Sequence, residues 1–316
     1  MTLLESARAV ADADDDGAID WDAVADAAKA ATDPGDIALS EREAEAYAAD
    51  VRAARERIQE VSGAEFDVPD TVEIQNRHHW VDANVETFRR VFEPLDRRPS
   101  LLPGVTRAVN TATTAGALAF VARNVLGQYD PILLAEGSHC LYFVHPNIVR
   151  VADDLGVPFP RFRRWIAFHE VTHAAEFGAA PWLSAYLGDR LEEGVAALSR
   201  GRMERRAFED LNLAMTAVEG YAELLMDETF DDEYADLRKK LDARRRGGGP
   251  LTRLLRRVLG FKLKREQYER GRAFFDAVAT ERGLAGASRV WESPDNLPTD
   301  RELEDPTRWL ARISPQ

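Results

Sequence analysis

A short segment near the middle of the chain combines two histidines and a glutamate at a spacing suited to binding a metal ion. Residues 165–177 contain the pattern His-Glu-x-x-His, formed by His169, Glu170 and His173. On a helix, residues four apart lie on one face, so both imidazoles can bind one metal ion. Glu170 lies about 100° around the same helix, where its carboxylate can accept a proton from a metal-bound water. The pattern therefore predicts a zinc centre with Glu170 as the general base.

This chemistry requires the motif to lie on a helix. Phe162, Trp165 and Ile166 precede the histidines at helical spacing, and Pro160 suits a first helical turn. The alternative is a pair of hydrogen-bonded core histidines without a metal. The helical context of the motif favours the metal site.

A catalytic zinc site needs a third protein ligand. A long helix is expected over residues 204–228, and on it Glu219 and Glu223 are four apart and share a face. Glu219 can supply the third ligand, and Glu223 can accept a hydrogen bond from a ligand imidazole. Glu193 is the competing third ligand, but Ala197 stands where a supporting acid would be. Two solvated glutamates on a helix surface are the remaining alternative.

The composition limits the classes of function. The 316 residues carry a net charge of −14 with 55 acidic side chains, which disfavours nucleic-acid binding because phosphate contacts need a basic surface. Only five of the 41 basic residues are lysines, and this acidic, lysine-poor composition is typical of a halophilic protein or of a GC-rich genome. The single cysteine, Cys140, excludes an intrachain disulfide. The sequence shows no leader and no transmembrane segment, so we expect a cytoplasmic protein.

Two parts of the chain are expected: an N-terminal helical segment over residues 1–63 and a metallohydrolase domain over residues 64–316. Ser40 and Glu43 form a capping-box pattern, which predicts a helix ending near Ser62. Further helices are expected at residues 78–92, 105–126, 183–197, 266–281 and from 306 onward. Residues 127–134 and 140–144 predict a strand hairpin just before the helix that carries His169 and His173, called the metal helix below. An edge strand beside this helix can bind an extended peptide through main-chain hydrogen bonds. His139 and His145 lie on this hairpin or at its ends, and a structural role is favoured for both.

A basic stretch at residues 237–265 holds twelve Lys or Arg and one acid, Asp242. Within it, an apolar stripe that includes Leu251 and Leu255 opposes Arg253, Arg256 and Arg257. This pattern suits recognition of an anionic substrate or a membrane surface. The favoured alternative is an amphipathic helix packed on the core, with its arginines paired to the protein's own carboxylates.

The His-Glu-x-x-His segment, Pro181-Trp-Leu and Glu219-Gly-Tyr-Ala-Glu together resemble a family of zincin-like zinc metalloproteases of archaea and actinobacteria. The resemblance extends from about residue 76 to 313. It implies zinc bound in the manner of gluzincins by His169, His173 and Glu219, with Glu170 as general base and Glu223 as a supporting acid. Two positions differ, because the family often has histidine at the position of Tyr221 and aspartate at that of Glu223. The family name carries an association with deazaflavin coenzyme biosynthesis.

These observations predict a mainly helical α+β, zincin-like fold with a small β-sheet beside the metal helix. The expected function is zinc-dependent hydrolysis of an amide, with a peptide or small amide as substrate. Tyr268, Tyr221, His145 or an arginine of the basic stretch can stabilise the oxyanion. The alternatives are a non-peptide amide hydrolase acting on an anionic substrate, and a zinc-containing binding or assembly protein without turnover. A nucleophilic role for Cys140 is disfavoured, and the residues indicate no oligomeric state.

Overall fold

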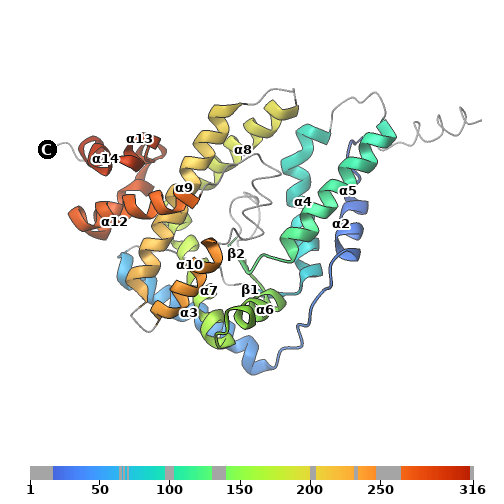
Figure 1. Ribbon diagram of the computed structural model, residues 1–316, viewed down its shortest axis with the longest axis horizontal. Coiled ribbons are helices and arrows are strands. Elements are labelled where there is room, and N and C mark those ends of the chain that lie inside the picture. The colour runs from blue at the N-terminus through green and yellow to red at the C-terminus, as the bar shows by residue number, and fades with distance from the viewer. Residues whose placement is uncertain are drawn as a thin grey trace, which may run out of the picture.

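The protein is mainly helical, with one small sheet near its centre (Figure 1). The structure is a computed structural model that describes residues 17–63, 66, 68–69, 71–96, 103–129, 140–199, 204–230, 234–246 and 265–313. The helices in chain order are α2 (Trp21–Ala30), α3 (Glu41–Ser62), α4 (Arg77–Asp96), α5 (Pro103–Ala122), α6 (His145–Leu155), α7 (Phe159–Ala179), α8 (Leu183–Ser199), α9 (Arg205–Thr229), α10 (Ala235–Arg246), α12 (Arg265–Ala287), α13 (Asp300–Glu304) and α14 (Pro306–Ile313). Two short 3₁₀ helices, η2 (Ser288–Glu292) and η3 (Pro294–Asn296), follow α12.

The sheet has three strands in the order β1 (Val72–Gln75), β3 (Leu141–Val144) and β2 (Gly127–Tyr129). β1 pairs with β3 in parallel, whereas β2 and β3 are antiparallel with Gly127 opposite Phe143. The central strand is apolar and its Leu141 and Phe143 are fully buried. β2 packs on α7, which carries the predicted metal motif. The expected α+β fold with a small sheet beside this helix is therefore confirmed.

Local sequence signals explain where several helices begin and end. The main-chain N–H of Glu43 donates to the Ser40 side chain, and the Glu43 carboxylate accepts from the main-chain N–H of Ser40, so the predicted capping box is formed. α3 ends at Gly63, whose φ of 65° is accessible to glycine at little cost. The predicted helices at 78–92, 105–126, 183–197, 204–228 and 266–281 correspond to α4, α5, α8, α9 and α12.

The sequence analysis missed two elements near the site. β1 alternates apolar and polar residues from Val72 to Gln75, but it is only four residues long, so the pattern is too short to predict a strand. α6 begins directly at the end of β3 with His145 and Pro146, where the structure has a helix and the sequence suggested only the end of a hairpin. The hairpin itself is confirmed by the pairing of β2 with β3, while residues 130–139, including His139, lie outside the described residues.

The largest core is built on α7, which is buried along most of its length by α3, α6 and α9. α3 contributes Tyr47 and Val51 to this core, together with Asp50, whose carboxylate pairs with Arg163 of α7 at 2.8 Å. Both side chains of this pair are about 10% exposed. The predicted boundary at residue 63 stays a prediction, but the side chains of α3 belong to the same core as the metal helix.

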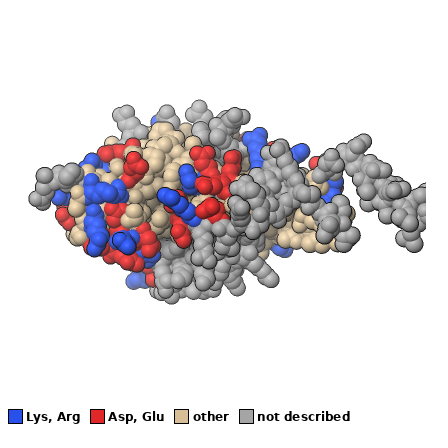
Figure 2. Space-filling view, turned by 90° about the horizontal axis from the view of Figure 1, so that it is seen from above, with Lys and Arg blue, Asp and Glu red and all other residues tan. Residues whose placement is uncertain are grey.

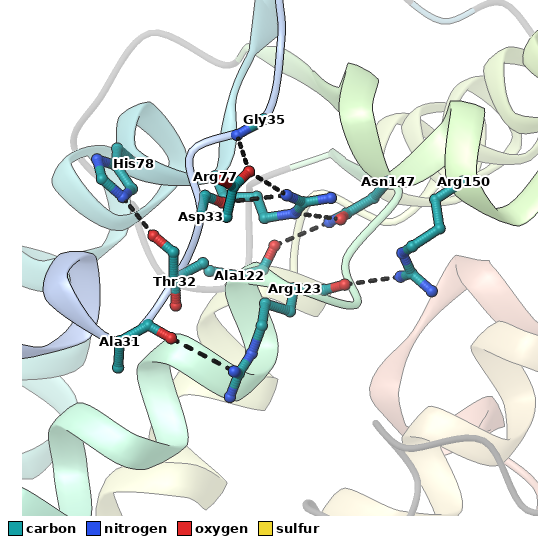
Figure 3. Close-up of polar contacts among 10 residues, drawn as sticks. All are labelled: Ala31, Thr32, Asp33, Gly35, Arg77, His78, Ala122, Arg123, Asn147 and Arg150. Carbon is teal, nitrogen blue, oxygen red and sulfur yellow. Dashed lines mark hydrogen bonds and ion pairs between the residues drawn. The ribbon is translucent and has the colours of Figure 1, made fainter.

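A second core joins α2, α4 and α5, and Val144 of β3 reaches it. Asn147, fully buried at the start of α6, connects this part to the rest (Figure 3). Its Nδ2 donates to the carbonyls of Ala122 and Val125 at 2.8 and 2.6 Å, and its Oδ1 accepts from Nε of Arg77 at 2.7 Å. Arg77 also donates to the carbonyl of Asp33 at 3.0 Å. One buried amide therefore fixes α6 against the ends of α4 and α5.

Two further arginines in Figure 3 each bind a main-chain carbonyl at the end of a helix. Arg150 donates to the carbonyl of Arg123 at 2.8 Å, just after α5. Arg123 donates to the carbonyl of Ala31 at 3.4 Å, just after α2. Such carbonyls lack partners within their helices, and cations near a helix C-terminus are favourable. This cluster of arginines therefore has a structural explanation.

The described surface mixes both signs of charge, as Figure 2 shows for one face of the molecule. Many arginines form ion pairs with acidic side chains, such as Arg161 with Asp236 and Arg270 with Asp300. The expectation of a halophilic protein stays a prediction. Within the described residues, no helix combines the length and the apolar character that crossing a bilayer demands.

Candidate metal centre

The two motif histidines project from one face of α7 toward a common point. Their Nε2 atoms are 3.3 Å apart and their ring centroids 4.7 Å apart. Two nitrogens bound to one tetrahedral zinc at ordinary bond lengths are separated by about 3.3 to 3.4 Å. The observed separation therefore fits joint ligation of a zinc ion by Nε2 of His169 and Nε2 of His173.

Glu219 of α9 completes the group. One ligand atom from each of His169, His173 and Glu219 can be chosen so that all lie within 4.8 Å of one another. α9 packs directly on α7, which brings Glu219 close to a motif 46 residues earlier in the chain. Two imidazoles and one carboxylate form a donor set of catalytic zinc sites, which keep a fourth position open. The residues present therefore fit zinc, and within the described residues this group has three members.

Each histidine ring has a neighbour that fixes its orientation. Nδ1 of His173 lies 2.7 Å from Oε2 of Glu176, a fully buried side chain one turn further along α7. The ring of His169 stacks on the indole of Trp165, with centroids 5.4 Å apart and planes 8° from parallel. Burial opposes protonation of His173, but the hydrogen bond and charge of Glu176 outweigh burial and raise the pKa of this histidine.

The side chain of Glu170 points toward strand β2 of the sheet. Its Oε2 accepts a hydrogen bond from the main-chain N–H of Tyr129 in β2 at 3.1 Å. Its side chain passes so close to Gly127 that a Cβ added there would lie 2.6 Å from Glu170 Cγ and Oε1. Burial raises the pKa of Glu170 to about 7, with the negative charge of Glu219 adding to the effect, while His173 and the Tyr129 N–H lower it. Such a pKa suits a group that takes and returns a proton near neutral pH.

The structure separates the two candidates for the third ligand. Glu193 lies on α8, is half exposed, and pairs with Arg190 at 2.8 Å. It does not belong to the group formed by Glu219 and the histidines. Glu223 follows Glu219 by one turn of α9, and its charge adds to the burial that raises the pKa of Asp227. Its role in orienting a ligand histidine stays a prediction.

The proposed oxyanion stabilisers occupy different places. Tyr221 is buried between Phe275 and Trp291, which it meets edge-on. His145 begins α6, and its Nδ1 lies 3.0 Å from the hydroxyl of Tyr47. The side chain of Tyr268 lies outside the described residues, as does most of the basic stretch, including Arg253, Arg256 and Arg257. The roles of all these residues stay predictions.

Cys140 is buried beside β3, and its thiol donates to the carbonyl of Thr71 at 3.3 Å. Burial raises the pKa of this thiol to about 11, so the nucleophilic thiolate is scarce at neutral pH. This agrees with the expectation that Cys140 has an ordinary packing role.

Two residues of the site escaped the sequence analysis. Glu176 stands three residues after His173, and this spacing on a helix was a usable signal for a contact. Gly127 carries no such signal, because its importance depends on how close a strand passes to α7.

With this geometry in place, comparison with known proteins assigns the class. The chain belongs to the family of zincin-like metallopeptidases, whose model matches residues 19–201 and 190–310. The chain is also similar to the crystal structure of "a putative hydrolase with a novel fold" from Chloroflexus aurantiacus, at 32% identity and a TM-score of 0.81. That similarity covers 94% of this chain and 99% of the other. No curated protein matches the chain. The family resemblance inferred from the motifs is therefore confirmed, and a hydrolase is supported at this general level.

Proposed function

We propose that the protein is a zinc-dependent peptidase in which Glu170 is the general base. The observation that supports this most directly is the combination of three ligands with a separate buried carboxylate. His169, His173 and Glu219 form the donor set, while Glu170 belongs to the motif but points to β2. A purely structural zinc usually has four protein ligands and has no use for a base. This arrangement therefore favours catalysis over a non-catalytic zinc-containing binding protein.

When bound, zinc would supply a Lewis acid that polarises the substrate carbonyl and makes water a stronger acid. Glu170 would accept the proton of the attacking water and pass it to the departing amide nitrogen. The main-chain N–H of Tyr129 donates to one oxygen of this carboxylate and so orients it. The pKa near 7 allows Glu170 to gain and lose the proton without a large free-energy difference.

The position of β2 supports a peptide as the substrate. In the described part of the sheet, β2 is an outer strand, with β3 as its neighbour on one side. It also packs on α7 beside the site. An extended peptide can add to an outer strand through main-chain hydrogen bonds, which places its amides next to the catalytic groups. The proposed substrate is therefore an extended segment of a polypeptide.

The test is a cleavage screen of zinc-loaded protein against a peptide library, read by mass spectrometry. Glu170→Gln is the control, because it keeps the size of the side chain and removes the base. Cleavage by the wild type that disappears in Glu170→Gln supports the proposal. Cleavage only of non-peptide amides bearing an anionic group would favour the amide hydrolase alternative, and no turnover with full zinc occupancy would favour the binding protein. The cytoplasmic location and the association with deazaflavin biosynthesis stay predictions.

A further inference from the structure

Glu176 is an acidic side chain buried inside the largest core of the protein. It lies on α7, is 0% exposed, and has Oε2 at 2.7 Å from Nδ1 of His173. An unpaired carboxylate in such a place is strongly unfavourable, so this residue needs a partner that repays its burial. The imidazole of His173 is that partner. If this position only had to fill space in the core, an apolar side chain would stabilise α7 more than a glutamate does.

The contact determines which nitrogen of His173 is available. A carboxylate accepts hydrogen bonds, so Nδ1 must carry the proton that is shared with Oε2 of Glu176. In the neutral ring this leaves the lone pair on Nε2, the atom that faces Nε2 of His169 at 3.3 Å. A neutral histidine with its proton on the far nitrogen is the form that binds a metal.

The second oxygen of Glu176, Oε1, is buried and has no hydrogen-bond partner among the described residues. α9, the helix that carries Glu219, packs on α7, and the main-chain N–H of Ala222 on α9 interacts with the Glu176 carboxyl. Glu176 therefore lies close to the helix of the proposed third ligand as well as to His173.

We propose that Glu176 is the positioning residue that fixes the tautomer and ring orientation of His173 for metal binding. This inference rests on the proposed zinc site and adds a supporting acid on α7 that is distinct from Glu223 of α9. It assigns no direct contact between Glu176 and the metal or the substrate. Its consequence is that zinc affinity depends on a hydrogen-bond acceptor at position 176.

The first experiment is a zinc titration of the full-length apoprotein against a competing chromophoric chelator, without substrate. Glu176→Ala should weaken zinc binding by about 10- to 100-fold, as losses of such supporting groups do. Glu176→Gln keeps an acceptor oxygen at the same reach and should bind zinc much closer to the wild-type affinity. Glu192→Ala, at an exposed position of α8, is the matched control and should bind as the wild type does. Zinc affinity of folded Glu176→Ala equal to that of the wild type would overturn the proposal.

A shorter acid keeps the test decisive if Glu176→Ala does not fold. Glu176→Asp retains the negative charge but shortens the side chain by one methylene, so its carboxylate no longer reaches His173. It should therefore bind zinc more weakly than Glu176→Gln, although Gln removes the charge. A merely structural need for a buried polar group would make Asp and Gln equivalent. Equal zinc affinities for the wild type, Glu176→Gln and Glu176→Asp would contradict the positioning role.

The second readout is the tautomer itself. In ¹⁵N-histidine-labelled, zinc-loaded wild type, the His173 ring should show a protonated Nδ1 and a metal-bound Nε2, with assignment from His173→Ala. In Glu176→Gln this pattern should persist, whereas in Glu176→Asp or Glu176→Ala the Nδ1 proton should exchange faster or disappear. An unchanged Nδ1 signal in Glu176→Ala would refute the inference. None of these measurements needs turnover, so a failure of peptidase activity alone leaves this result standing, whereas absence of zinc binding in the wild type would overturn both.

Discussion

Gly127 of β2 and Glu170 of α7 are packed so closely that no side chain fits between them. A Cβ on Gly127 would lie 2.6 Å from Cγ and Oε1 of Glu170, well inside van der Waals contact. The same strand donates the Tyr129 N–H to Oε2 of Glu170. β2 therefore constrains the position of Glu170, the proposed general base, and the close approach leaves no room for a side chain at position 127.

The first prediction concerns this contact. Gly127→Ala should displace Glu170 and lower kcat by on the order of 100-fold, since small misplacements of a catalytic group have effects of this size. Zinc affinity should change little, because the three proposed ligands are on α7 and α9. Steady-state kinetics and a zinc titration on the same preparation check both parts. Wild-type kcat in Gly127→Ala would show that Glu170 is not held by β2.

The second prediction concerns the ligands. The wild type should carry about one zinc per chain, and His169→Ala or His173→Ala should lose it, because two remaining ligands hold zinc poorly. Glu219→Ala should lower zinc affinity by orders of magnitude. Glu193→Ala should leave it nearly unchanged, because Glu193 pairs with Arg190 away from the site. Metal analysis and competition titrations measure these effects, and a damaging Glu193→Ala beside a silent Glu219→Ala would reverse the assignment.

The group of His169, His173 and Glu219 that could hold a metal was predictable from spacing within helices. His169 and His173 are one helical turn apart, and Glu219 was favoured over Glu193 by the acid at position 223. Most helices were predictable for the same reason, since apolar periodicity and the Ser40 capping box are local signals.

The features that escaped prediction depend on contacts between distant segments. β1 is a strand because it pairs with Leu141 to Val144, and its own alternation of apolar and polar residues spans only four positions. The close approach of Gly127 to Glu170 follows from the placement of β2 against α7, 43 residues later in the chain. Glu176 was a different case, because its spacing from His173 was visible but an acid on a helix is usually solvated. Its burial on that face of α7, which the sequence does not show, is what led to the role proposed for it.

The third prediction concerns the crossing of α9 and α12 next to Glu219. A Cβ on Gly271 would lie 2.5 Å from the main-chain oxygen of Thr216, and a Cβ on Gly220 would lie 2.6 Å from the carbonyl carbon of Gly271. Gly271→Ala should therefore separate the two helices and lower the free energy of unfolding by about 1 to 3 kcal/mol, as overpacking does. The displaced α9 should also weaken zinc binding through Glu219. Chemical denaturation and zinc titration measure the two effects.

Gly188 provides the matched control for this substitution. It also lies within a helix, α8, but a Cβ there would have no neighbour within 4 Å. Gly188→Ala should raise stability by roughly 0.5 to 1 kcal/mol, because alanine loses less conformational entropy in a helix. Equal effects of the two substitutions would show that the α9–α12 crossing tolerates a side chain.

The last prediction concerns pH and the C-terminal helices. Glu302 of α13 is buried, accepts hydrogen bonds from Arg312 at 2.6 and 2.9 Å, and accepts another from the N–H of Thr299 at 2.9 Å. Burial opposes ionisation of this carboxyl, but the bonds from Arg312 and Thr299 outweigh burial and lower its pKa below the ordinary value of 4.5. The stabilisation is therefore fully present above the unfolded pKa and is lost as the pH falls through the lower folded pKa.

Glu302→Gln should therefore be less stable than the wild type at pH 7, by about 1.5 kcal/mol for lost hydrogen bonds to a charged group. The difference should shrink as the pH falls below about 4.5, because the wild-type carboxyl then becomes neutral as well. Glu304→Gln is the control, since Glu304 is 67% exposed and lies 3.7 Å from Arg270, a pair that contributes little. Urea unfolding of the three proteins at pH values from about 3 to about 7, a range that includes the carboxyl pKa, measures these differences in the free energy of unfolding. A stability difference for Glu302→Gln that does not change with pH would show that the ionised form of Glu302 does not stabilise the contact between α13 and α14.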